Sequence, residues 1–136
     1  MAGPRLSQAA VRADYAAVYG DLGVLRNAVQ LYAADHGGRL PAADRFTAQM
    51  TGYSDVTGEQ LSKVHTAETP LGPYLRQMLP VRVGDHAGST AVSAVSGTPT
   101  RPLTGDGAGA GWLMDVHTGA VWPNAWGFLP EADPAD

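Results

Sequence analysis

Oxygen-bearing side chains alternate along one short stretch near the middle of the chain. Asp55, Thr57 and Glu59 stand at every second position, and Ser54 directly precedes them. Alternate residues in a turn can direct their oxygens at one cation, and calcium prefers six to eight such ligands. The stretch lacks the third acidic position and the closing Glu of an EF-hand loop. It is therefore a candidate calcium site, and the alternative is a solvated polar loop.

The four histidines do not show the spacing of a zinc site. Zinc ligands occur in pairs separated by a short loop or by one helical turn. Here the histidines fall in four separate loops or element ends: His36, His65, His86 and His117. His36 follows the expected end of a helix, where it can bond to the last carbonyl groups. We therefore predict no zinc site and no cofactor other than the candidate calcium ion.

One weak arrangement for nucleophilic catalysis is present. Asp115 and His117 could act with a distant serine, because catalytic triads are defined by geometry and not by sequence order. The Gly-x-Ser-x-Gly turn of many serine hydrolases is absent. Asp115 more simply ends a strand and holds the turn at residues 117–119. The sequence therefore favours a protein that is not an enzyme, with a hydrolase as an open alternative.

Aromatic side chains gather near the C-terminal end of the chain. Trp122 and Trp126 flank Asn124, and the three could form a surface that binds a glycan or a peptide. Packing into the core is the alternative role for such aromatic residues. This stretch is the first place where we expect a ligand, if the protein binds one.

Composition excludes several classes of partner. The formal net charge is −4, with nine Lys and Arg spread singly along 136 residues, which argues against binding to nucleic acid or to an anionic membrane. No apolar run reaches the length of a membrane span, and residues 1–6 lack the apolar core of a signal peptide. We expect a single soluble domain over residues 7–128, preceded by a disordered or artificial start at residues 1–6.

A long amphipathic helix is predicted over residues 7–36, with Ser7 as its N-cap and Gly37 and Gly38 at its end. Spacings of three and four place seven apolar residues on one stripe: Val11, Tyr15, Val18, Leu22, Leu25, Val29 and Tyr32. A second line recurs every seven residues at Ala10, Ala17, Val24 and Leu31. Either another part of the chain covers this line or a neighbouring copy does.

The rest of the domain is predicted to be rich in loops. Glycine and proline concentrate after residue 36, so we expect an irregular loop region at 37–89 and a small sheet at 90–124. Three short strands form an antiparallel meander: 91–95, 111–116 and 120–122. Residues 105–111, GDGAGAG, are expected to be a flexible connector, and residues 129–136 a disordered acidic tail. The fold class is α+β, with the long helix packed on the sheet.

Several of these segments together resemble one family of proteins. They are LRNAVQLYAADHGGRLP (25–41), Phe46, QMTGYSD (49–55), GPYL (72–75), Pro80, GWLMDVHTG (111–119) and Asn124. Their order and spacing are similar to the globular part of type IV pilin-like proteins, and most similar to the major pseudopilins of type II secretion systems. The resemblance spans residues 21–124.

The resemblance implies a non-enzymatic structural subunit in the cell envelope, in a periplasmic or extracellular filament. Subunits of this family assemble helix to helix, with further copies or with other pilin-like subunits. Membrane attachment in the family uses an N-terminal apolar segment that these 136 residues do not contain. We expect the assembly contacts at Ala10, Val11, Tyr15, Ala17 and Val18. The alternative is a soluble binding module with the same fold, which recognises its ligand through the aromatic surface.

Overall fold

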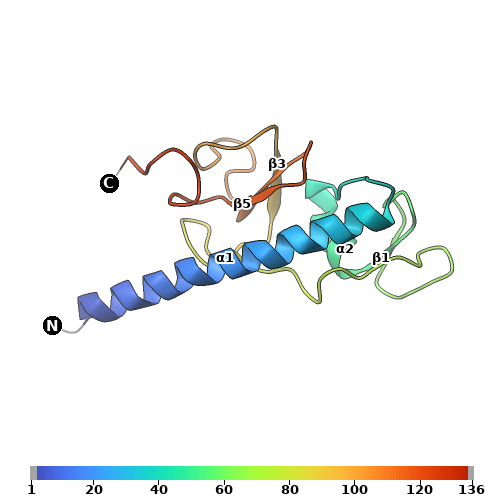
Figure 1. Ribbon diagram of the computed structural model, residues 1–136, viewed down its shortest axis with the longest axis horizontal. Coiled ribbons are helices and arrows are strands. Elements are labelled where there is room, and N and C mark those ends of the chain that lie inside the picture. The colour runs from blue at the N-terminus through green and yellow to red at the C-terminus, as the bar shows by residue number, and fades with distance from the viewer. Residues whose placement is uncertain (1–2, 135–136) are drawn as a thin grey trace.

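The computed structural model describes residues 3–134, with side chains from residue 10 onward, and begins with one long helix. Helix α1 spans Gly3–Asp35, 33 residues, and runs along most of the length of the molecule (Figure 1). It begins four residues before Ser7, so the expected N-cap is wrong. Proline is tolerated in a first helical turn, which allows Pro4 there. Residues 3–6 are therefore helical, and residues 1 and 2 lie outside the described range.

The first apolar stripe of α1 is the centre of the core. Five of its residues are at most 4% exposed: Val18, Leu22, Leu25, Val29 and Tyr32. The helix ends as predicted at Gly37, whose φ is +67°, and the Gly38 amide donates to the Ala33 carbonyl at 2.8 Å. Nδ1 of the buried His36 lies 2.6 Å from the Tyr32 carbonyl, so this ring also holds the helix end.

The region between the helix and the main sheet contains a second, short helix and a pair of short strands. A 3₁₀ turn at Ala43–Arg45 leads into helix α2 at Phe46–Thr51, and strands β1 (Tyr53–Ser54) and β2 (Leu61–Ser62) form an antiparallel pair. Buried Gln49 fastens the turns around them. Its Oε1 accepts from the Ala42 amide at 2.7 Å and its Nε2 donates to the Gly58 carbonyl at 3.0 Å.

The main sheet has three strands in the order β3-β4-β5, which span Val92–Val95, Trp112–Asp115 and Val121–Pro123. Strands β4 and β5 are antiparallel, as predicted, but β3 and β4 are parallel, so the predicted meander is wrong at its first connection. A parallel pair needs a long crossover that returns the chain to the starting end. Residues 96–111 supply it. The fold is therefore α+β with one antiparallel and one mixed sheet.

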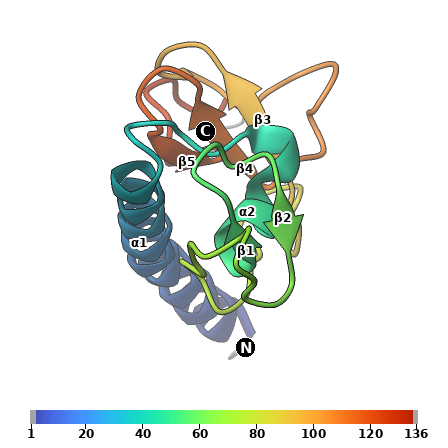
Figure 2. The ribbon, with the colours of Figure 1, turned by 90° about the vertical axis from the view of Figure 1, so that its right-hand side faces the viewer.

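One face of the main sheet packs on α1. Trp112 and Met114, at most 1% exposed, join the core around the helix stripe together with Val121, which lies opposite Met114. This confirms the predicted packing of the long helix on the sheet. Trp112 Nε1 donates to the Leu79 carbonyl at 2.8 Å. Viewed along the helix, the sheet and α2 lie on the same side of α1, and the opposite side of the helix is bare (Figure 2).

The C-terminal segment returns to the N-terminal half of α1. The Phe128 ring stacks on Tyr15 with centroids 5.0 Å apart, Leu129 is 8% exposed, and the Glu131 amide donates to the Thr100 carbonyl at 2.7 Å. The tail predicted to be disordered from residue 129 therefore begins with anchored residues. Residues 135 and 136 of that tail lie outside the described range.

Candidate functional site

The second apolar line of α1 is not covered by the described part of the chain. Val24 and Leu31 are each 49% exposed, Ala10 is exposed and Ala17 is half-buried. Within residues 3–134, the alternative that another segment packs over this line is therefore not realised at Val24 or Leu31. Exposed apolar side chains that fall on one line mark a candidate contact surface.

The surface around this line carries no charged residue between residues 10 and 34. At 100° per residue, an arc of about 140° opposite the core contains only small, apolar or amide side chains. We call this arc the outer face of α1, and its exposed or half-buried members are Ala10, Ala13, Ala16, Ala17, Gly20, Gly23, Val24, Asn27, Leu31 and Ala34. The seven-residue apolar repeat in the sequence identifies only four of these residues, because it does not register positions that merely lack a charge.

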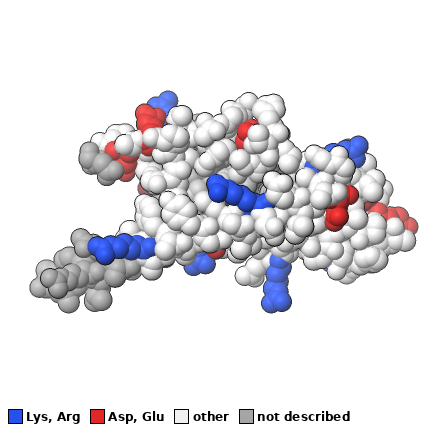
Figure 3. Space-filling model, viewed as in Figure 1, with Lys and Arg blue, Asp and Glu red and all other residues white. Residues whose placement is uncertain are grey.

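Charged residues flank the outer face with opposite signs on its two sides. Arg12 and Arg26 lie on one flank, and Asp14 and Asp21 lie on the other. Asp21 Oδ2 accepts from Arg82 Nε at 2.8 Å, and Arg26 donates to the Val121 carbonyl at 2.9 Å. In the view of Figure 3, most of the surface is uncharged. The outer face is thus bounded by two short rows of opposite charge.

The predicted assembly contacts divide between surface and core. Val11 is 52% exposed and remains available to a partner, whereas Val18 is fully buried. Tyr15 is half-buried and stacks on Phe128. The prediction for Val18 is therefore wrong. The core reaches Val18, and Phe128 of the C-terminal segment covers Tyr15.

Oxygens in the candidate calcium stretch bond within the stretch itself. Asp55 Oδ1 accepts from Thr57 Oγ1 at 2.8 Å and from the Gln60 amide, and Thr57 Oγ1 accepts from the Glu59 amide. The hydrogen bond from Thr57 is the largest cause that lowers the pKa of Asp55. Ser54 is buried, with its Oγ 2.7 Å from His36 Nε2. Among the described residues, no group of three or more His, Asp or Glu side chains is placed to hold a metal ion.

Asp115 holds its turn, as the simpler interpretation predicted. Its carboxylate accepts from the backbone amides of His117 at 3.0 Å and Gly97 at 3.2 Å and from Thr118 Oγ1 at 2.9 Å. The His117 amide bond is the largest cause that lowers the pKa of Asp115. Ser96 Oγ lies 3.2 Å from His117 Nε2, so a Ser–His pair exists, but the bonds from Asp115 go to the His117 backbone. The arrangement supports a turn.

Asn124, the polar residue of the predicted aromatic surface, is buried and cannot contact a ligand at the surface. Asn124 is 3% exposed, and its Oδ1 accepts from the Leu103 amide at 2.7 Å. Its Nδ2 donates to the carbonyls of Ala108 at 3.1 Å and Ala110 at 2.8 Å. Trp122 and Trp126 are half-buried. Asn124 thus fastens the Gly-rich connector to the sheet, so that segment is held in place instead of being a free linker.

Comparisons with protein-family models, with curated proteins and with solved structures found no match to this chain. Over the described residues, no helix combines the length and the apolar character that crossing a bilayer requires. The outer face of α1, an exposed arc without charged residues from residue 10 to residue 34, is the candidate functional site.

Proposed function

We propose that this chain is the globular part of a non-enzymatic, filament-forming subunit of the type IV pilin-like or type II secretion pseudopilin class. The observation that carries the proposal is the uncharged outer face of α1. A helix that packs on one side normally carries charged residues on the other, and 16% of this chain is charged. A helix face that contacts only water normally carries charge, so an uncharged face along most of a 33-residue helix is suited to contact with another protein surface.

Small residues suit this face to contact with another helix. Gly20 and Gly23 have no neighbouring atom within 4 Å of where a Cβ would stand, so a partner backbone could approach closely there. Val24 and Leu31 are each half exposed, and covering them contributes about 1 kcal/mol apiece. Such a contact is weak between two copies, and it becomes stable when each subunit makes it with several neighbours.

The flanking charges favour one arrangement of copies. The basic flank with Arg12 and Arg26 can lie against the acidic flank with Asp14 of the next copy. This contact joins two different surfaces, and repeated contacts of this kind build an open helical assembly if they do not close into a ring. Other pilin-like subunits could take the place of a copy, in the cell envelope or outside it. Attachment to a membrane would use a segment that these residues do not contain.

Charge placed on the outer face tests the proposal. We expect the double variant Val24→Asp with Leu31→Asp to stay monomeric, because burying two carboxylates at a helix contact is costly. The matched control is Val56→Asp with Val64→Asp, at loop positions 62% and 65% exposed. Sedimentation velocity over rising concentration measures the mass. The proposal fails if the unmodified protein stays monomeric throughout, or if the outer-face variant associates as strongly as the control.

A further inference from the structure

Strand β3 has one open edge. It pairs only with β4, and in that parallel ladder the Ala91 carbonyl accepts from Trp112 at 3.1 Å and the Val95 carbonyl from Val116 at 3.0 Å. Backbone groups of alternate residues point to opposite sides of a strand. The amides and carbonyls of Val92 and Ala94 therefore point away from β4. Within residues 3–134, no other strand pairs with this edge.

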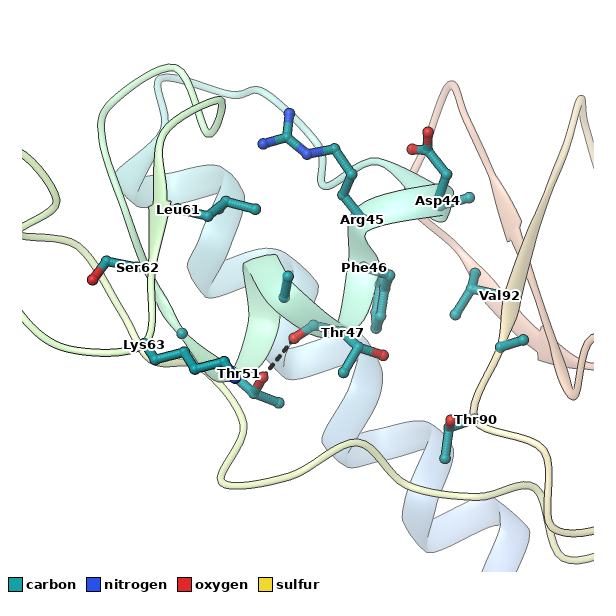
Figure 4. Close-up of a pocket in the computed structure, with 14 residues that line it drawn as sticks. Asp44, Arg45, Phe46, Thr47, Thr51, Leu61, Ser62, Lys63, Thr90 and Val92 are labelled. Carbon is teal, nitrogen blue, oxygen red and sulfur yellow. Dashed lines mark hydrogen bonds between the residues drawn. The ribbon is translucent and has the colours of Figure 1, made fainter.

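A groove of about 890 Å³ begins beside this edge. Thr90 and Val92 form one wall, and β2 with Lys63 after it forms the other (Figure 4). Exposed Thr47 and half-buried Thr51 of α2 line the groove between the two walls. A strand laid along β3 would therefore have a hydrogen-bonding edge on one side and a recess for its side chains next to it.

The groove carries more positive than negative charge. Its charged lining residues are Arg45, Lys63 and Asp44, on a chain whose net charge is −4. Arg45 donates to the Glu59 carbonyl, whereas the exposed Lys63 side chain extends toward Thr51 (Figure 4). The described residues place no carboxylate within ion-pair distance of Lys63. An acidic group on a ligand would complement this ammonium group.

We propose that the open edge of β3 binds an extended, acidic peptide segment of a partner protein by strand addition. Val92 and Ala94 supply main-chain donors and acceptors, alternate side chains of the peptide enter the groove, and a carboxylate meets Lys63. A peptide fits better than a small ligand, because the four unpaired groups lie in a row at the spacing of a strand. This contact is separate from the outer face of α1.

Synthetic peptides test the strand addition. The probe is an eight-residue peptide of alternating Val and Thr with one central Asp, titrated into the ¹⁵N-labelled full chain. We expect saturating shifts of the Val92 and Ala94 amide signals. The same peptide with N-methyl groups at alternate amides cannot donate to the edge, so it should bind at least about tenfold more weakly, and so should the peptide with Lys in place of Asp.

Two variants separate the edge from the charge. Ala94→Pro removes an outward amide without touching the ladder to β4, so it should retain the fold and lose peptide binding. Lys63→Glu should reverse the preference between the Asp and Lys peptides, whereas Arg101→Glu, an exposed control outside the groove lining, should not.

Three results would overturn the proposal. The first is that the amide signals of Val92 and Ala94 do not shift with the Asp peptide in millimolar excess. The second is that the N-methylated peptide binds as tightly as the unmodified one. The third is that these signals shift with protein concentration in the absence of peptide, which would assign the edge to a second copy. Because Val24 and Leu31 do not line the groove, the outer-face variant should bind the peptide normally. This proposal and the assembly proposal can therefore fail independently.

Discussion

The two long faces of α1 differ in what covers them. On the inner face, Leu25 is fully buried in the core, and on the outer face, six residues later, Leu31 is 49% exposed. Both faces lack charged residues over most of their length. One of them therefore stabilises the monomer, and the other is left exposed, where we propose that subunits meet. Apolar periodicity alone does not distinguish these two roles.

The same substitution on the two faces gives the largest predicted contrast. Leu25→Ala leaves a cavity in the core and should lower the free energy of unfolding by about 2 to 5 kcal/mol. Leu31→Ala should change it by no more than about 0.5 kcal/mol, because the side chain is already half in water. Urea denaturation of the monomer followed by circular dichroism measures both. Equal losses from the two variants would contradict the assignment of the faces.

The covered face has a weaker end near the N-terminus, where the cover is the C-terminal segment. Phe128→Ala removes the stack on Tyr15 and a tilted contact with Tyr19 at 5.2 Å, and should cost about 1 to 2 kcal/mol. Hydrogen exchange should speed up around Tyr15 and not around Leu25. Val116→Ala, at a position 45% exposed, is the control. Uniform faster exchange along α1 would show that the cover is not local.

Glycine on the outer face gives the smallest predicted effect and the most selective one. Gly20→Ala should raise the stability of the monomer by about 0.5 to 1 kcal/mol, because alanine favours a helix and the site is open. It should weaken association, because a methyl group holds a partner helix away. Gly37→Ala, at φ +67°, should instead destabilise. Thermal unfolding and sedimentation measure the two effects, and stronger association of Gly20→Ala would contradict close helix contact.

Local sequence patterns predicted which helices and strands form better than they predicted which elements lie side by side. The spacing of apolar residues identified the inner stripe of α1, and the turn at residues 117–119 was predicted from His117, Thr118 and Gly119, because both features depend on residues close in sequence. The parallel pairing of β3 was missed, since residues 96–111 have no pattern that specifies a crossover. Pairing direction depends on the whole chain path and not on the strand itself.

The candidate sites show the same limit. Val18 was assigned to the surface, but it is fully buried in a core cluster whose other members include Met78, Val83 and Trp112, which lie far from it in the sequence. Asn124 looked like part of a ligand surface, but its amide is used by carbonyls of the Gly-rich connector. The outer face could have been found in full from the sequence. The absence of charged residues from one arc of a helix is a periodic pattern, just as the recurrence of apolar residues on the inner stripe is.

Cross-linking between subunits in the native cell tests the central claim most directly. The chain contains no cysteine, so the introduced thiols are the only ones on its 136 residues. With Val24→Cys and Leu31→Cys combined, a short bis-maleimide should give a ladder of covalent multimers, and Val56→Cys with Val64→Cys should not. This result would place the outer face of α1 at the contact between subunits. A ladder of equal strength from the loop pair, or none from the outer-face pair, would contradict it.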